Sequence, residues 1–283
     1  MSKLPTGYTE LEYIQSSGTQ YIDTGHIPTA NTKVSMDFQL TAVADGENAC
    51  LFGVVGQFSF RWFGNLVVFR SNGANNVDFP KGIPALNRHS VEKTATKTIL
   101  DKTKTVTTTA GNVSKTLYLL AQRGSSAAQN FSSAKLYSCQ IYENGALVKD
   151  FVPCKNASGT IGLYDTVGEQ FYTNAGTGAF TAGPEIIPDP PVTPANLQSG
   201  IAVALRWTAS EGAETYNVYR DGSKIGSTGK TQFVDLTAGE NETYTYTVTA
   251  ENSGGESAGV SVTVYTKSGY FQYKPLIESA NFP

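Results

Sequence analysis

The sequence predicts an all-β protein built from two β-sandwiches, and three observations carry this prediction. Apolar residues recur at every second position in short runs such as Val34, Met36, Phe38 and Leu40, which is the period of a strand with one buried face. Turn-forming pairs such as Asn144-Gly145 separate the runs. A proline-rich stretch divides the runs into a long first group and a shorter second group.

Composition supports the same fold class and excludes several functions. The 283 residues are 40% hydrophobic and 16% charged, which is enough apolar material for two buried cores. A net charge of −3 gives no basic field for phosphates, so we expect no nucleic-acid partner. The chain starts without an apolar signal region and has no apolar run of membrane-spanning length, so we expect neither secretion by a leader nor membrane insertion.

The first group of strands occupies residues 1–184. Alternating or continuous apolar runs and turn signals predict strands, in chain order, at 8–14, 19–23, 33–40, 49–55, 58–63, 66–70, 87–94, 97–100, 104–109 and 116–121. The run at 104–109 is polar and rich in threonine, so we place it at a sheet edge or on a solvated face.

The last part of this segment predicts two hairpins. Tyr137, Cys139 and Ile141 alternate with polar residues and are expected on one buried face. Asn144-Gly145 then turns the chain into a returning strand at 147–152, and Val167-Gly168 joins a second pair at 161–165 and 169–172. Short strands of this kind need a larger sandwich to cover their apolar faces.

Two stretches at the ends of this segment carry a resemblance to a known family. YTELEYIQSSGTQYIDTG at 8–25 and the block at 135–185 resemble the laminin-G-like, concanavalin-A-like sandwich domains of phage and prophage structural proteins. The resemblance implies a two-sheet jelly roll over 1–184 and a non-enzymatic role in a virion.

The second group of strands follows a predicted linker at 185–195, where prolines stop both sheets. Residues 196–266 contain seven short strand signals, with Trp207, the run YNVYRDG at 216–222, and Leu236 ahead of Tyr244. This pattern resembles a fibronectin type III domain, an immunoglobulin-like sandwich. The resemblance implies a tyrosine corner at Tyr244 and no catalysis.

The remaining residues, 267–283, are too apolar for a free polar tail. Two interpretations stay open, a docking segment for a neighbouring subunit or a segment that packs back on the fibronectin-like domain. The aromatic and aliphatic residues that would dock are Tyr270, Phe271, Tyr273, Leu276, Ile277 and Phe282.

Catalytic and metal-binding motifs are absent from the sequence. No Glu-x-Asp-x-x-Glu strand of the laminarinase type occurs, and Glu10 and Glu12 share a face that we expect to be solvated. His26 and His89 lack zinc-ligand spacing. We therefore expect a protein that is not an enzyme and has no metal cofactor. Calcium stays open without a motif, with candidate ligands at Asp45, Glu47, Asp78 and Asp165.

One hairpin carries the residues that we propose for ligand binding. An aromatic face can stack on a sugar while arginine and asparagine donate hydrogen bonds, and this combination occurs at Arg61, Trp62, Asn65, Arg70 and Asn72. The alternative is that Trp62 belongs to the core of the larger sandwich, as large aromatic residues usually do.

The three cysteines do not suggest a disulfide framework, because their number is odd and each lies on or beside an apolar strand. Cys139 and Cys154 flank one hairpin, so they either pair or remain buried free thiols.

Together these observations lead to a first hypothesis, a non-enzymatic virion surface protein of a phage, as a fibre or decoration of the head or tail. It would be assembled in the cytoplasm of the bacterial host and would bind host-surface or mucosal glycans. Its partners would be other virion proteins and further copies of itself. Two alternatives remain: a structural cement or fibre subunit without a ligand, and an accessory module of a glycan-processing enzyme.

Overall fold

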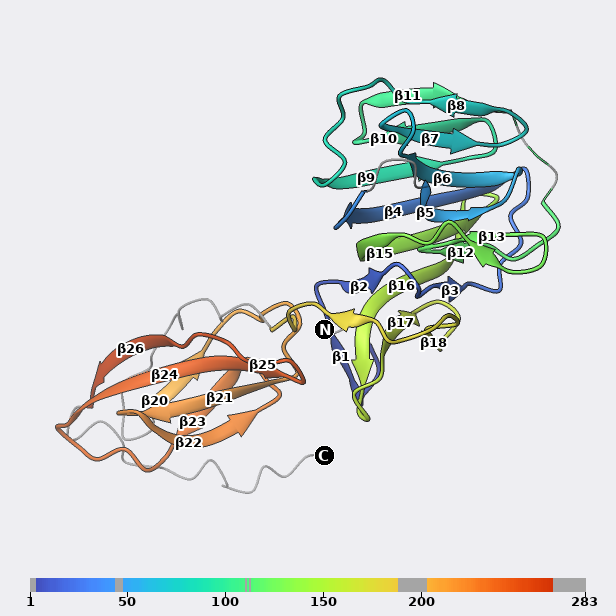
Figure 1. The fold of residues 1–283 in the computed structure, drawn as a ribbon. Helices are drawn as coiled ribbons and strands as arrows, with labels where there is room; N and C mark the ends of the chain where they lie inside the picture. The colour runs from blue at the N-terminus through green and yellow to red at the C-terminus, as the bar shows by residue number, and fades with distance from the viewer. Residues whose placement is uncertain (1–3, 44–47, 110, 112, 188–202, 267–283) are drawn as a thin grey trace, which may run out of the picture. The chain divides into compact units, whose positions relative to one another are not determined.

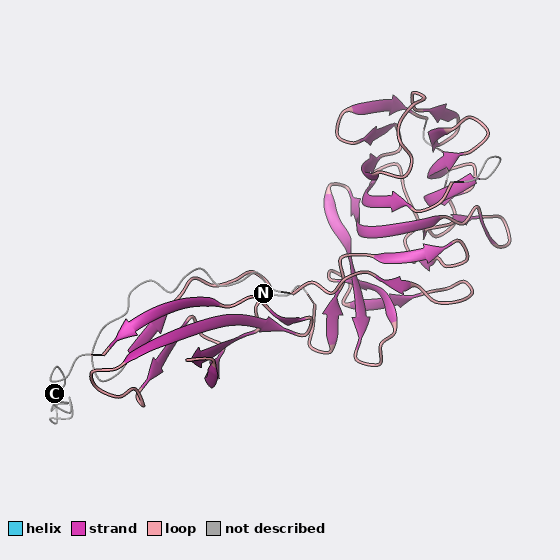
Figure 2. Cartoon of the chain, turned by 60° about the vertical axis from the view of Figure 1, so that its left-hand side comes forward, coloured by secondary structure: helices cyan, strands magenta, loops and turns pink. Residues whose placement is uncertain are grey.

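The computed structural model describes residues 4–43, 48–109, 111, 113–187 and 203–266 (Figure 1). These residues form strands and no helix (Figure 2), so the predicted all-β fold class is confirmed. Two compact units divide the chain, one ending at Ile186 and the other beginning at Ile187. None of the described residues forms a helix that is long and apolar enough to cross a membrane.

The first unit contains two sheets, and the longer one is antiparallel throughout. Its strands follow the order β11-β10-β9-β4-β15-β16-β17-β18, while β2 joins β15, β1 joins β16 and β19 joins β2. The strands are β1 (Tyr8–Glu10), β2 (Ile14–Ser17), β4 (Thr32–Leu40), β9 (Arg88–Lys93), β10 (Lys97–Leu100), β11 (Lys104–Thr107), β15 (Ser133–Glu143), β16 (Ala146–Asn156), β17 (Ile161–Asp165), β18 (Gln170–Thr173) and β19 (Thr181–Ala182). The polar strand β11 lies at the edge, as its composition predicts.

The second sheet of this unit has the order β14-β13-β5-β6-β7-β8, with β12 pairing with both β5 and β3. Its strands are β3 (Ile22–Asp23), β5 (Asn48–Val54), β6 (Phe58–Phe63), β7 (Val68–Asn72), β8 (Asn76–Asp78), β12 (Tyr118–Leu119), β13 (Gln122–Arg123) and β14 (Ala128–Gln129). β13 runs parallel to β5, and the other pairs are antiparallel.

An aromatic core joins the inner faces of these two sheets. Phe38 of β4 lies 5.8 Å from Phe60 and 5.9 Å from Phe69, measured between ring centroids. Phe60 and Phe69 stack at 5.4 Å, and all three side chains are fully buried. Burying each ring contributes roughly 1.5–3 kcal/mol to folding, so this cluster is a main source of the unit's stability.

The predicted buried face of β15 is wrong at Tyr137. Cys139 and Ile141 are buried, but Tyr137 is partly exposed and Leu136 is buried instead. A bulge between Leu136 and Ser138 in the pairing with β4 causes this difference, because an extra residue moves the following side chains to the opposite face.

The three cysteines are all buried and free. Cys139 belongs to the main core, whereas Cys154 belongs to a small cluster with Leu4, Val152 and Tyr164. Neighbouring Phe151 of β16 points into the main core, so Cys154 lies on the other face of the sheet. The free-thiol alternative therefore describes the structure, and the Cys139–Cys154 pair does not form.

The first unit extends two residues beyond 184, where the sequence places its end. Glu185 forms a bridge with Leu11, and the Ile186 N–H donates to the Glu10 carbonyl at 3.0 Å. Backbone pairing thus continues past Pro184, which still offers its carbonyl as an acceptor.

The second unit is a smaller sandwich, as its resemblance implies. One sheet pairs β20 (Val203–Arg206) with β23 (Gln232–Asp235). The other has the order β22-β21-β24-β25, with β26 also pairing with β24. Its strands are β21 (Thr215–Arg220), β22 (Ser223–Thr228), β24 (Thr243–Asn252), β25 (Gly255–Glu256) and β26 (Val260–Tyr265). The core includes Trp207 and Tyr216, whose rings lie 5.3 Å apart.

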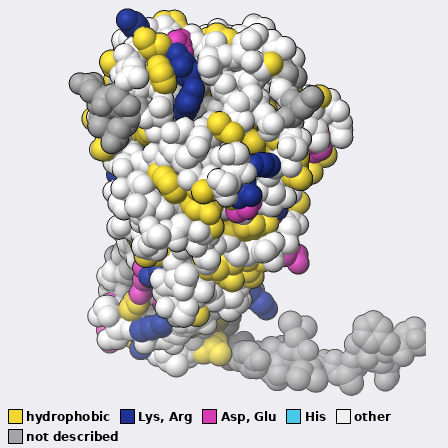
Figure 3. Space-filling view, turned by 45° about the vertical axis from the view of Figure 1, so that its right-hand side comes forward, with side chains coloured by type: hydrophobic (Ala, Val, Ile, Leu, Met, Phe, Trp, Pro, Cys, Tyr) yellow, Lys and Arg dark blue, Asp and Glu magenta, His cyan; other side chains and the backbone are white. Residues whose placement is uncertain are grey.

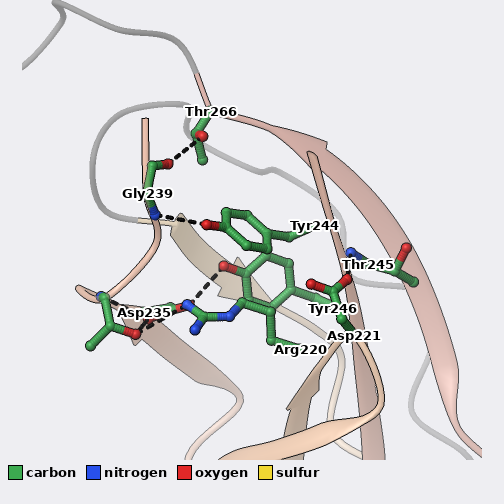
Figure 4. A network of polar contacts seen from close by, with 9 residues as sticks. Arg220, Asp221, Asp235, Gly239, Tyr244, Thr245, Tyr246 and Thr266 are labelled. Carbon is green, nitrogen blue, oxygen red and sulfur yellow. Dashed lines mark hydrogen bonds and ion pairs between the residues drawn. The ribbon is translucent and has the colours of Figure 1, made fainter. Parts of the chain in front are cut away.

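A tyrosine corner closes one end of this unit, as Figure 4 shows. The Tyr244 hydroxyl accepts a hydrogen bond from the Gly239 N–H at 2.9 Å. The next tyrosine on the same strand, Tyr246, donates to Asp235 at 2.7 Å. The corner fixes the loop between β23 and β24, as it does in fibronectin type III domains.

Candidate functional site

The five predicted ligand residues all lie on β6, β7 or the turn between them, but not on one surface. Trp62 points into the core, whereas its neighbour Arg61 and the cross-strand Arg70 lie on the outer face of the second sheet. Asn65 is exposed in the turn, and Asn72 is buried near the end of β7. The structure therefore separates the expected aromatic platform from its expected hydrogen-bond donors.

Trp62 does not present an open ring face. It is 3% exposed, and its ring centroid lies 5.1 Å from that of Phe69 in an edge-to-face contact. The alternative interpretation of Trp62, as a core residue, describes this packing. Part of the same side chain nevertheless lines a cleft between the two sheets.

The cleft has a volume of about 570 Å³ and lies at one end of the first unit. Segments far apart in sequence meet there: the turn after β2, the end of β4, the start of β5, the end of β6 and the chain leading into β15. The lining residues are Ser17, Gly18, Ala42, Val43, Asn48, Ala49, Trp62, Asn130, Phe131 and Ser133.

The turn at Ser17 and Gly18 forms one wall of the cleft. Gly18 has φ +101°, and a Cβ at this position would lie 3.1 Å from Ser133 Oγ, so glycine suits both the conformation and the space. The Gln20 side chain fixes the turn, because its Oε1 accepts from the Ser17 N–H at 2.9 Å.

Asn130 forms a second wall and has the left-handed backbone conformation, with φ +50°. Asparagine tolerates this conformation better than most side chains. The Asn130 carbonyl accepts from the Cys50 N–H at 2.8 Å, and its Nδ2 donates to Gln122 Oε1 at 2.7 Å. Hydrogen bonds to β5 and β13 thus hold both the backbone and the side chain of Asn130 in place.

The lining combines aromatic surface with uncharged polar groups. Phe131 is partly exposed, and its ring lies 6.0 Å from that of Tyr21. The Asn48 Oδ1 atom is buried and has no donor among the described residues. No Asp, Glu, His, Lys or Arg occurs among the described lining residues. Such a lining can bind a neutral polyhydroxylated ligand.

The outer face of the second sheet carries a different arrangement. Arg70 lies 3.8 Å from the Phe63 ring centroid and pairs with Asp78, with Nη2 at 2.9 Å from Oδ2. Arg61 lies 5.4 Å from the same ring. In Figure 3 most of the visible surface is neither charged nor hydrophobic, and Lys and Arg side chains gather in a short line near its upper edge.

The calcium candidates do not come together in the described residues. Asp78 is bound to Arg70, and Asp165 is buried, where its carboxylate accepts from Lys149 Nζ and the Asp150 N–H at 3.0 Å each. Asp45 and Glu47 lie outside the described residues. Across the described ranges, no three His, Cys, Asp or Glu side chains are grouped to hold a metal.

The predicted docking residues, Tyr270 to Phe282, also lie outside the described residues. Most of the cleft could not be predicted from the sequence, because nothing in a single sequence brings residues 17, 48 and 130 together. The sequence Ser16-Ser17-Gly18 was the one signal available. It predicts a turn but does not indicate which residues lie opposite that turn.

No protein-family profile matches the chain. Among curated proteins, the chain is 42% identical over 71 residues to a poly(3-hydroxybutyrate) depolymerase of Ralstonia pickettii, covering 24% of this chain and 14% of that protein. It is 32% identical over 128 residues to an alpha-amylase of Niallia circulans, covering 36% and 10%. It is 35% identical over 107 residues to chitinase Chi52 of Paenibacillus xylanexedens, covering 35% and 20%. The chain thus spans between 10 and 20% of these relatives.

Three solved structures are similar to parts of the chain. FN3tt has 27% identity and a TM-score of 0.27, covering 30% of this chain and 99% of that chain. A putative carbohydrate binding protein of Bacteroides ovatus has 12% identity and a TM-score of 0.44, covering 62% of each chain. The CBM40 of the Ruminococcus gnavus IT-sialidase has 15% identity and a TM-score of 0.33, covering 50% and 92%.

Proposed function

We propose that the first unit binds a carbohydrate polymer in the cleft without cleaving it, and that the fibronectin-like unit serves as a spacer. The observation that carries this proposal is the set of described lining residues, which are uncharged and include the partly exposed Phe131 and Asn48, whose buried Oδ1 has no donor among the described residues. Sugars present apolar C–H faces and many O–H donors, which match these two groups.

The curated relatives support a role near polymeric substrates. An alpha-amylase and a chitinase are glycan-degrading enzymes, and the third relative is a depolymerase. The similarity covers at most 20% of their length, which fits a shared accessory module better than a shared catalytic domain. Binding without turnover is therefore the function that we expect for this chain.

Affinity gel electrophoresis with soluble starch, glycol chitin and dextran tests this proposal. We expect retardation by at least one polymer and no release of reducing sugar. Phe131→Ala and Asn48→Ala should each weaken binding by about tenfold, because a stacked ring or a satisfied buried acceptor contributes on the order of 1–2 kcal/mol.

Tyr265→Ala is the matched control, since Tyr265 is 51% exposed on the fibronectin-like unit. Its binding should equal that of the wild-type protein. Equal binding by the two cleft variants would contradict the cleft as the site, and failure of every polymer to retard the chain would contradict glycan binding itself.

The glycan-binding chain could belong to one of two assemblies. The first is the virion of a phage, where the chain would be a surface fibre or decoration, assembled in the host cytoplasm and bound to other virion proteins and to its own copies. The two-sandwich order and the sequence resemblance to phage structural proteins support it. The expected measurement is its detection by mass spectrometry in particles purified on a density gradient, and its absence from pure particles would contradict it.

The second candidate is an accessory module of a glycan-processing enzyme. The three enzyme relatives favour it. Recovery of the chain with a glycan hydrolase from clarified culture, rather than with particles, would support this setting. A subunit that only cements a particle would bind none of the glycan probes.

A further inference from the structure

Two arginines face each other across β6 and β7 on the outer face of the second sheet. Arg61 and Arg70 are direct cross-strand partners in the register. Like charges at opposed positions repel each other, so this pair costs stability unless anions compensate both residues. The aromatic ring of Phe63 lies beside both guanidinium groups.

The available carboxylate compensates one of the two arginines. Asp78 of β8 is the register partner of Arg70 and binds it through both oxygens, with Nη2 at 2.9 Å from Oδ2. This two-point contact uses the geometry in which arginine and a carboxylate match best. Asp78 therefore neutralises Arg70 and leaves Arg61 without a counter-ion of its own among the described residues.

The Arg61 guanidinium has no hydrogen-bond or ion-pair partner among the described residues. Its Nε is buried and unsatisfied, and the side chain as a whole is partly exposed. Burial lowers the pKa of Arg61, and the Arg70 charge adds to this change, while Cys50 and Asp78 oppose it. A partly desolvated charge without a partner is a costly feature in a folded protein.

We propose that Arg61 binds an anionic substituent of a glycan, a carboxylate or a phosphate, while Arg70 and Phe63 form the side of the site. A guanidinium presents several N–H donors in a plane and matches either group bidentately. Arg70 adds positive potential and stays anchored by Asp78. This site extends the proposed function to acidic glycans, so it rests on glycan binding by the first unit.

The site is separate from the cleft, and this allows the two proposals to be tested independently. Arg61 and Trp62 are consecutive residues of a strand, so their side chains point to opposite faces of the sheet. A neutral polymer can therefore occupy the cleft whether or not Arg61 binds an anion.

Binding of the full chain to three polymers tests the inference: polygalacturonate, which carries carboxylates, glycerol-phosphate teichoic acid, and neutral dextran. We expect at least one acidic polymer to bind, with an affinity that falls as salt rises from 50 to 300 mM. Arg61→Gln should lower this affinity by about tenfold or more. Arg61→Lys should restore part of it, since charge returns without the planar donors.

Arg88→Gln is the matched control for the loss of one positive charge. Arg88 lies on β9 in the other sheet and is already paired with Asp37, with Nη2 at 2.8 Å from Oδ2. Its acidic-glycan binding should stay within about twofold of wild type, because the site does not include it. Thermal unfolding checks that Arg61→Gln folds, and removal of the repulsion predicts no loss in Tm.

Two results would overturn the acidic site. One is the absence of binding to both acidic polymers at 50 mM salt, and the other is equal binding by wild type and Arg61→Gln. If a neutral glycan still binds in the cleft, the proposed function stands and this inference alone fails. A preference for teichoic acid over polygalacturonate would assign phosphate, and the reverse would assign carboxylate.

Discussion

Lys93 Nζ donates a hydrogen bond to Ser71 Oγ at 2.9 Å in the interior of the first unit, and the described residues give this amine no carboxylate partner. Lys93 is the last residue of β9 and is fully buried, with its nitrogen 4.8 Å from the Phe58 ring centroid. Burial lowers the pKa of Lys93 from 10.5 to about 7. A charged lysine is thus unfavourable in the folded state.

The first unit should become more stable as pH rises from about 7 toward 10.5, the interval between the folded and unfolded pKa of Lys93. In this interval the unfolded chain keeps a proton that the folded chain has released, so the free energy of unfolding increases by up to about 1.4 kcal/mol per pH unit. Below pH 7 both states are protonated and this dependence disappears. Urea unfolding between pH 6 and 10 measures it.

Lys93→Met should stabilise the first unit at pH 6 by on the order of 1–3 kcal/mol and remove this rise, because it replaces a buried amine by an apolar chain of similar length. Lys97→Met, at an exposed position of β10, is the control and should leave the pH profile unchanged. If wild type and Lys93→Met showed the same dependence of unfolding free energy on pH, the assignment of this dependence to Lys93 would be wrong.

The sequence predicted the strands better than their faces. β6 and β10 begin and end where their alternation and turn residues place them. Lys93 was not foreseen, because a lysine within a polar-looking strand is expected in solvent and single-sequence reasoning has no measure of depth. The face of Tyr137 depended on a bulge, which the two-residue period cannot reveal.

The candidate site was predictable in part, for a related reason. The strands predicted at 58–63 and 66–70 correctly placed the predicted residues on one hairpin, but alternation alone sends Arg61 and Trp62 to opposite faces. In the second unit, the buried residue before the tyrosine corner is Ala238, while Leu236 is 75% exposed. Leu236, one of the residues that carry the resemblance, is therefore not part of the core of this unit.

Asp235→Ala should destabilise the fibronectin-like unit by about 3–5 kcal/mol, because it leaves buried donors and a charged partner without an acceptor. The Asp235 carboxylate accepts from Tyr246, from Arg220 Nη1 at 2.8 Å and from both the N–H and hydroxyl of Thr237. Calorimetry of the full chain measures the shift in its transition. Glu211→Ala, at an exposed position, is the control and should leave that transition in place.

Acid should weaken the same unit. Burial alone would raise the pKa of Asp235, but the Thr237 and Tyr246 hydrogen bonds and the Arg220 charge outweigh burial and lower it. A lowered pKa means that the stabilisation is complete above the ordinary pKa of 3.8 and is lost as pH falls through the folded value. Unfolding monitored between pH 6 and 2 should show this loss, and Asp235→Asn should show a smaller dependence.

Tyr244→Phe should cost about 1–2 kcal/mol, because it deletes the acceptor of the Gly239 N–H and keeps the ring. Tyr265→Phe removes a hydroxyl from a tyrosine that is 51% exposed and should change the free energy of unfolding little. Urea unfolding of both variants makes the comparison. Equal stability of the two variants would mean that the corner bond adds nothing to this fold.

The cysteines should react as three buried thiols. Burial raises the pKa of both Cys50 and Cys154 to about 12, and burial also raises the pKa of Cys139. Thiol reagents attack the thiolate, so native protein at pH 8 should consume almost no Ellman reagent, whereas protein in 6 M guanidinium chloride should release about three equivalents. One equivalent after unfolding would reveal a disulfide and contradict the placement of Cys139 and Cys154 on opposite faces. Cys154→Ser separates the cases, since it lowers the count from three to two if all thiols are free and raises it from one to two if Cys139 and Cys154 are paired. Reduction of the unfolded wild-type protein leaves its mass unchanged in the first case and adds two hydrogens in the second.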